Sequence, residues 1–152
     1  METIYIEFME ELKILLKEIE NSWWNQWIQK SIDKYKNNQD VLYYLSAFGG
    51  MGSFNDEVIT CEATMILQKI TYIMARQIKN QGSFILNDIL QDTQARVRQM
   101  VEQAERNKDN NIKYYTSMLN YINYVIESYS GGNLHQITNS YLEQKDINNK
   151  RK

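Results

Sequence analysis

Three charged residues interrupt the most apolar stretch of the sequence and are its best candidates for chemistry. Glu62, Lys69 and Arg76 recur every seven residues within a mostly apolar run that extends from Glu57 to Ile78. Seven residues are close to two turns of an α-helix, so the three side chains fall on one face. Charges on an otherwise buried helix either pair with neighbouring helices or build a polar site. We predict ion pairs with neighbouring helices and keep a polar site as the alternative.

A glycine-rich turn precedes this run. Gly49, Gly50 and Gly52 permit positive φ angles that other residues avoid. Ser53 stands three residues before Asp56, which is the capping-box spacing of a helix start. We therefore predict a tight connection between two helices. A phosphate-binding loop is disfavoured, because no Lys-Ser or Lys-Thr follows the glycines and Asp56 places negative charge on the first helical turn.

Metal binding and nucleophilic catalysis have little support in the sequence. The chain has one histidine, His135, and one cysteine, Cys61, which are too few for a structural zinc site. No Glu-x-x-His pair of the di-iron bundle type occurs. Cys61 lies in the apolar run, where thiols are usually inert. We therefore predict no metal, no cofactor and no catalytic residue, and we do not expect an enzyme.

Composition favours a single all-α domain. The 152 residues are 43% hydrophobic and 24% charged and include no proline, the commonest helix breaker. A net charge of −2 provides no basic field for nucleic acid. A lone cysteine cannot form an internal disulfide, and neither a signal peptide nor an apolar run long enough for a membrane span is recognisable. We expect a cytoplasmic protein without a membrane or direct nucleic-acid partner.

Hydrophobic periodicity predicts a single-domain bundle of about five to seven helices around a buried central helix over 57–78. The other helices are expected at about 3–20, 22–36, 41–48, 84–107, 112–129 and 133–144. The first two could also form one bent helix. The single helical domain is predicted to cover 1–144, and 145–152 to form a polar, frayed C-terminal tail.

Two features of the first helices favour a surface for a protein partner. An acidic stripe with an apolar anchor follows helical spacing on the first helix and consists of Glu7, Glu11, Ile14 and Glu18. A solvated helix face is the alternative interpretation of this stripe. Trp23 and Trp24 diverge by about 100° on a helix, so they cannot be buried in the same direction. We predict that Trp24 faces the partner.

The run Gly49-Gly50-Met51-Gly52-Ser53-Phe54-Asn55-Asp56, preceded by a tryptophan-rich helix, resembles the motif of a small uncharacterised bacterial domain family. The resemblance covers about residues 23–59. Members of that family are short helical proteins, and some resemble immunity proteins encoded beside polymorphic or contact-dependent toxins. The resemblance implies a toxin inhibitor that acts by occluding an active site. Its acidic stripe would then complement the basic cleft of a toxin that attacks nucleic acids.

Two other functions remain open from the sequence. The chain could be a small-ligand-binding protein or an enzyme with a pocket near Gly50 to Asp56 and the charged line of Glu62, Lys69 and Arg76. That function requires a concave pocket in which those charges are unpaired. A helical adaptor or a homodimer is the third hypothesis.

Overall fold

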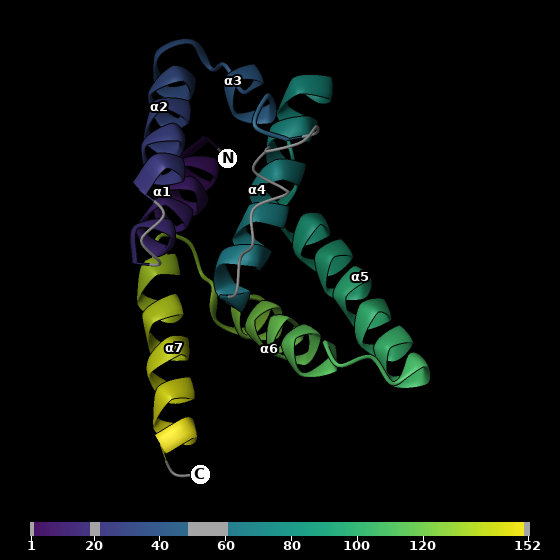
Figure 1. Ribbon diagram of the computed structural model, residues 1–152. Coiled ribbons are helices and arrows are strands. Elements are labelled where there is room, and N and C mark those ends of the chain that lie inside the picture. The colour runs from purple at the N-terminus through teal and green to yellow at the C-terminus, as the bar shows by residue number, and fades with distance from the viewer. Residues whose placement is uncertain (1, 19–21, 49–60, 151–152) are drawn as a thin grey trace.

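The computed structural model describes residues 2–18, 22–48 and 61–150 of the chain. These residues form seven helices and no strand, which confirms the predicted all-α bundle (Figure 1). In chain order the helices are α1 (Glu2–Glu18), α2 (Ser22–Asn38), α3 (Leu42–Leu45), α4 (Glu62–Gln81), α5 (Leu86–Asn107), α6 (Ile112–Ser128) and α7 (Leu134–Lys150).

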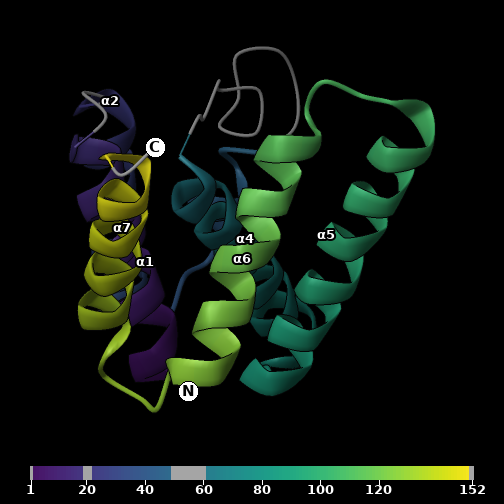
Figure 2. The same cartoon turned by 90° about the horizontal axis from the view of Figure 1, so that it is seen from below.

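The central helix of the bundle is α4. It contacts α1, α3, α5 and α6, and Figure 2 shows it between α1 and α5. Its buried side chains include Ile66, Leu67 and Ile70. The buried hydroxyl of Thr71 lies 2.7 Å from that of Tyr44 on α3, so a polar group inside the bundle has an internal partner. The predicted central helix is therefore confirmed from residue 62 onward.

The segments before and after α4 both contain glycine, and the structure describes the one after it. The predicted turn at Gly49, Gly50, Gly52, Ser53 and Asp56 lies outside the described residues. At the other end Gly82 has a φ of 79°, and its N–H donates to the carbonyl of Ile78. This left-handed cap is the one that glycine provides most readily at a helix C-terminus.

The first helix is buried on more of its circumference than its periodicity predicts. Phe8, Leu12 and Leu15 recur at helical spacing and lie in the core, and Tyr5 and Met9 are fully buried as well. The reason is that α2, α4 and α7 all pack against α1. A helix covered on several sides leaves little room for an exposed acidic stripe.

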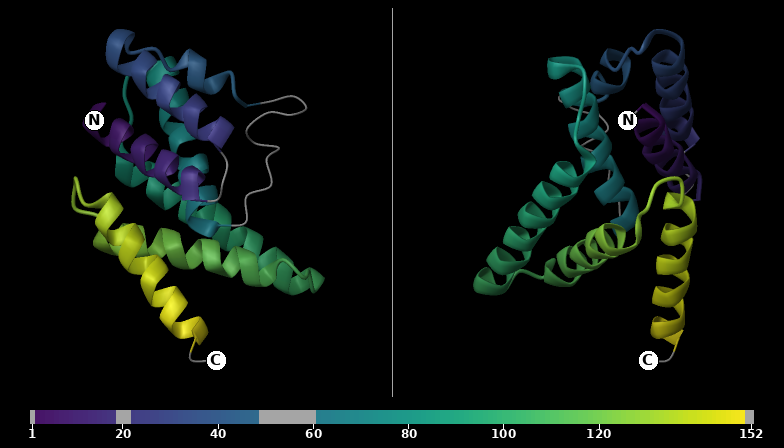
Figure 3. Two further views of the ribbon diagram at one scale, coloured as in Figure 1. Left: turned by 60° about the vertical axis from the view of Figure 1, so that its left-hand side comes forward. Right: turned by 180° about the vertical axis from the view of Figure 1, so that it is seen from behind.

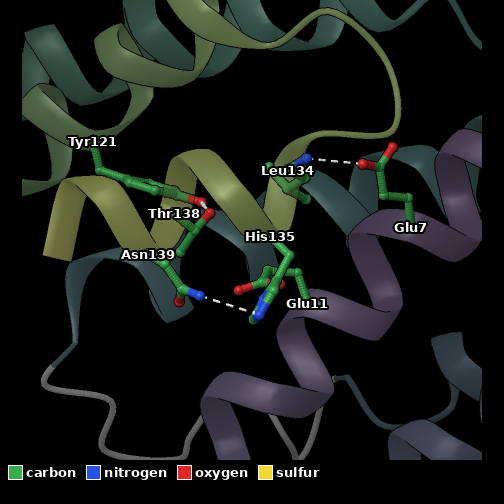
Figure 4. Close-up of polar contacts among 7 residues, drawn as sticks. All are labelled: Glu7, Glu11, Tyr121, Leu134, His135, Thr138 and Asn139. Atoms are coloured by element: carbon green, nitrogen blue, oxygen red, sulfur yellow. Dashed lines mark hydrogen bonds and ion pairs between the residues drawn. The ribbon is translucent and has the colours of Figure 1, made fainter. Parts of the chain in front are cut away.

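Glu7 on α1 caps the N-terminus of α7. One of its carboxylate oxygens accepts a hydrogen bond of 2.9 Å from the N–H of Leu134 (Figure 4). The other accepts from the N–H of Gly132 at 3.1 Å and from the hydroxyl of Tyr129. The first N–H groups of a helix have no intrahelical partner and carry partial positive charge. A carboxylate 127 residues away in the chain therefore supplies the cap of α7.

Two further polar pairs connect α7 to the bundle. The buried carboxylate of Glu11 on α1 lies 2.7 Å from Nδ1 of His135, as Figure 4 shows. Burial raises the pKa of Glu11, and the hydrogen bond with His135 opposes that rise. On the α6 side, the buried hydroxyls of Tyr121 and Thr138 lie 2.8 Å apart. Figure 3 shows α6 between α5 and α7.

The last helix is longer than predicted. It was expected to end near Gln144, but α7 runs to Lys150, so the predicted polar tail is helical over residues 145–150. Inside this stretch the Lys145 ammonium forms an ion pair with Glu62, which is 2% exposed. The hydroxyl of Tyr141 donates to the same carboxylate at 3.1 Å. A buried carboxylate needs such partners, so Lys145 has a structural contact and does not belong to a frayed tail.

The cap on α7 predicts a specific cost for losing Glu7. Replacing Glu7 with Ala removes three hydrogen bonds at once, so the free energy of unfolding should fall by about 2–3 kcal/mol. Urea denaturation measures this change. The matched control is Glu18→Ala, because Glu18 is exposed on the same helix and its loss should change stability by less than about 0.5 kcal/mol. Equal effects of the two substitutions would contradict the assigned cap.

Candidate functional site

A groove of about 480 Å³ opens between α4 and α5, and we call it the α4–α5 groove. Its lining from α4 is Lys69, Tyr72, Ile73, Arg76, Gln77, Asn80 and Gln81, and from α5 it is Thr93, Arg96, Val97 and Met100. Three of these side chains are cationic, and none of the described residues that line the groove is acidic. The groove is therefore a basic site on a chain whose net charge is −2.

A second hollow of about 470 Å³ adjoins the groove on the side of α3. It is lined by Leu45, Phe48, Gln68, Lys69, Tyr72, Arg76, Lys79 and Asn80. Lys69, Tyr72 and Arg76 line both hollows, so they stand between the two. Among the described lining residues the second hollow again has no carboxylate. Both depressions thus present positive charge to whatever enters them.

Lys69 is a half-buried cation that lines both hollows. No carboxylate in the described part of the chain lies within ion-pair distance of its ammonium group. Burial lowers the pKa of Lys69, and the neighbouring positive charge of Arg96 lowers it further. A lysine in these surroundings is short of negative charge, which an incoming anion would supply.

The two arginines of the groove differ in how far neighbouring groups compensate their charges. Arg76 is exposed, donates to the hydroxyl of Tyr72 at 3.3 Å, and lies 5.7 Å from the centre of that ring. Arg96 forms an ion pair of 3.0 Å with Asp92 one turn away on α5. An exposed pair of this kind contributes little to stability and exchanges readily for another anion. Arg76 therefore presents the less compensated charge, with its guanidinium held by an aromatic ring.

Thr93 adds an unsatisfied polar atom to the wall of the groove. Its side chain is 2% exposed, and its Oγ1 has no hydrogen-bond partner within the described residues. Most buried hydroxyls in folded proteins have a partner, which is protein, water or ligand. The remaining wall from Ile73, Val97 and Met100 is apolar. The site thus combines cations, a hydroxyl and an apolar surface.

The predicted line of Glu62, Lys69 and Arg76 does not form one site. Each step of seven residues advances about 10 Å along a helix, so Glu62 and Arg76 are about 20 Å apart along α4. Glu62 forms the ion pair with a neighbouring helix that we predicted, through Lys145 of α7. Lys69 and Arg76 instead line the α4–α5 groove, and neither forms an ion pair with an acidic side chain of the described residues.

The predicted partner-binding stripe is not a continuous acidic surface. Glu7 caps α7 and Glu11 is 2% exposed, so neither carboxylate is available to a partner in the way we expected. Ile14 is partly buried, and Glu18 is the exposed member of the stripe. The expectation failed because α7, far away in the sequence, folds back onto this face of α1.

The exposed tryptophan of α2 is Trp23, which is 60% exposed, whereas the predicted Trp24 is 5% exposed and lies in the core. Trp24 shares its face of α2 with the buried residues Ile28, Ile32 and Tyr35. Their spacing of four, four and three residues is visible in the sequence and would have assigned the two indoles correctly.

Trp23 begins an aromatic surface that the sequence did not reveal in full. Its ring stacks on Trp27 with centroids 5.8 Å apart, and Trp27 stacks on Tyr43 of α3 at 4.3 Å. The ammonium groups of Lys30 and Lys34 lie 5.3 and 5.7 Å from the centre of the Tyr43 ring. We call these five residues the tryptophan surface.

Comparison with known proteins adds one finding about the family. Residues 17–65 match the model of a domain of unknown function (DUF6966). This segment, about a third of the chain, includes α2 and α3 and reaches the start of α4, so it contains the tryptophan surface and ends before Lys69. It supports the expected similarity to an uncharacterised family. Neither the curated proteins nor the solved structures gave a match to the chain.

Two other classes of site are absent from the described residues. No group of three or more His, Cys, Asp or Glu side chains there is placed to hold a metal ion. Among the helices that the structure describes, none combines the length and apolarity needed to cross a membrane. The α4–α5 groove and the tryptophan surface remain the two candidates for function.

The uncompensated charge of Lys69 predicts that its removal stabilises the protein. Lys69→Met keeps the apolar stem and removes a half-buried cation, so the free energy of unfolding at neutral pH should rise by about 0.5–1 kcal/mol. Lys79→Met is the control, because Lys79 is an exposed lysine on the same helix and its loss should be neutral or slightly destabilising. Urea denaturation compares the two variants.

The pH dependence of this difference follows from the lowered pKa of Lys69. Between that pKa and the ordinary value of 10.5, the unfolded chain binds more protons at this position than the folded chain does. The contribution of Lys69 to the free energy of unfolding of the wild-type protein therefore rises with pH through this interval. The difference in this free energy between Lys69→Met and the wild type should shrink accordingly. An advantage that grows toward alkaline pH, or a destabilised Lys69→Met at neutral pH, would show that the amine has an internal partner.

Proposed function

We propose that this chain is a binding protein that holds an anionic ligand in the α4–α5 groove. One observation carries the proposal: Lys69, Arg76 and Arg96 surround an apolar wall without any acidic side chain among the described lining residues. The positive charge of Arg96 disfavours the charged form of the neighbouring Lys69, and a bound anion would relieve this repulsion. The ligand is expected to carry a phosphate or carboxylate group, since these oxyanions match the donors of a guanidinium group.

The remaining lining suggests what else the ligand contains. Ile73, Val97 and Met100 offer apolar contacts that a bare inorganic ion could not use. The hydroxyl of Thr93 and the amide of Gln77 add polar contacts at fixed positions. Ligand sites commonly combine apolar walls with a few oriented polar groups. The groove therefore suits an oxyanion attached to a small apolar or aromatic group.

Phenyl phosphate and inorganic phosphate test this function as probes. Isothermal titration calorimetry should show phenyl phosphate binding roughly tenfold more tightly than inorganic phosphate, because its ring contacts the apolar wall. Arg76→Glu should weaken phenyl phosphate binding by about tenfold or more. The matched control Arg98→Glu makes the same charge change on exposed α5 surface outside the groove, and it should have little effect. Equal losses in the two variants would contradict the proposal.

The tryptophan surface supports a second function. We propose that the chain is also a candidate for a cytoplasmic immunity-type protein that inhibits a bacterial toxin by covering its active site. The supporting observation is that Trp23 is 60% exposed and stacked, whereas isolated apolar side chains of this size are usually covered. This surface lies within the segment that matches DUF6966. Lys30 and Lys34 would favour an acidic partner surface, opposite to the basic cleft expected from the sequence.

Co-expression with the products of the adjacent genes tests this second function. If one product binds, Trp23→Ala should lower the affinity by about tenfold or more, because an exposed stacked indole is a typical hot spot. Ile85→Ala is the control, since Ile85 is 65% exposed and lies on the connection between α4 and α5. Unchanged affinity of the Trp23→Ala variant, measured by surface plasmon resonance, would exclude the tryptophan surface as the interface.

A further inference from the structure

The amine of Lys69 has the surroundings of a reactive group. It lines both the α4–α5 groove and the adjoining hollow, so it borders open space on two sides. It is half-buried, and no described carboxylate pairs with it. Lysines that form imines with carbonyl compounds share this combination of desolvation, access and missing counter-charge. Lys79 lies on the same helix but lines only the second of the two hollows. Its side chain is exposed, so its amine is not desolvated in the way that the amine of Lys69 is.

We propose that Lys69 captures its ligand covalently, by forming an imine with an aldehyde or ketone that also carries an oxyanion. This inference rests on the proposed function, because the oxyanion is held by the cations of the groove. Lys69 and Arg76 are seven residues apart, which separates their backbones by about 10 Å along α4. Both side chains reach into the same groove. The carbonyl and the oxyanion of the ligand should therefore stand several bonds apart, on the two sides of a small apolar framework.

The surroundings of Lys69 favour the neutral amine that this reaction needs. Burial and the charge of Arg96 both lower the pKa of Lys69, so a larger fraction of the amine is unprotonated near neutral pH than for an exposed lysine. The same Arg96 contributes to the attraction for an anion. Arg96 thus both attracts the ligand and favours the neutral form of Lys69. Binding then places the carbonyl carbon next to a nucleophilic amine.

The reaction balances without an additional reactant. The lone pair of the neutral Lys69 nitrogen forms a bond with the carbonyl carbon, and the carbonyl oxygen becomes a hydroxyl by taking one amine hydrogen. The carbon–oxygen bond then breaks, and the oxygen leaves as water with the second amine hydrogen while the carbon–nitrogen double bond forms. No group is oxidised or reduced. The step is reversible, so the groove would retain its ligand and release it again by hydrolysis.

Pyridoxal 5′-phosphate is a suitable probe, because it joins an aldehyde and a phosphate on an aromatic ring. The full chain is incubated with this probe at neutral pH, the imine is reduced with sodium borohydride, and the modified lysine is located by peptide mass spectrometry. Lys69 should be labelled roughly tenfold faster than Lys79, because binding in the groove concentrates the aldehyde beside it. An excess of phenyl phosphate should remove this preference.

The variant Lys69→Arg distinguishes covalent capture of the ligand from non-covalent binding in the groove. The substitution keeps the positive charge and removes the nucleophilic amine, so phenyl phosphate should still bind while the preferred labelling disappears. If wild-type protein binds phenyl phosphate but labels Lys69 no faster than Lys79, the covalent proposal is overturned and the binding function stands. If phenyl phosphate does not bind, the proposed function itself is wrong. Preferred labelling of Lys69 that phenyl phosphate does not suppress would also overturn the proposal, because the oxyanion would then have no part in it.

Discussion

The burial of α4 decides what happens to each charged side chain that it carries. A helix packed by α1, α3, α5 and α6 has few directions left toward water, so its charges must find partners or lie at gaps between neighbours. Glu62 finds Lys145 and Tyr141 at the end where α7 passes. Arg76 reaches solvent near the other end of the helix. Lys69, between them, reaches the gap between α4 and α5, and that gap is the candidate site.

Polar side chains of α1 meet the start of the last helix, next to its buried core residues Leu134 and Ile137. Glu7 caps its first N–H groups and Glu11 lies beside His135, so α1 provides two carboxylates to one helix terminus. Glu11 is buried by this contact and the partly buried Glu7 is engaged in hydrogen bonds, so both carboxylates have a structural role in place of the expected recognition role. The partial positive charge of a helix N-terminus makes it a favourable place for them. The contacts that attach α7 are therefore the same ones that use the carboxylates of the predicted acidic surface.

The sequence was sufficient for the helices and for much of the core, because both follow from local periodicity. The central helix was predicted from residues within a few turns of one another, and it is formed from Glu62 to Gln81. Contacts between distant segments were not predictable in this way. Nothing local indicates that Leu134 would be capped by Glu7, or that Thr93 and Arg96 of α5 would face Lys69. The stripe on α1 was misassigned for the same reason, since its cover lies more than 120 residues away.

A half-buried lysine that has no acidic partner in the described part of the chain requires an explanation that stability does not provide. A methionine of similar length would fill the same space without desolvating a charge. Two turns earlier on α4, the buried Glu62 forms an ion pair with Lys145 of another helix. At Lys69 the facing helix instead presents another cation, Arg96, and the hydroxyl of Thr93, which has no hydrogen-bond partner among the residues that the structure describes. Like charges gathered around a shared space raise the energy of the empty site and lower that of an anionic complex. The arrangement is therefore unfavourable for folding alone and favourable for binding, which is why the groove between α4 and α5 carries the functional assignment.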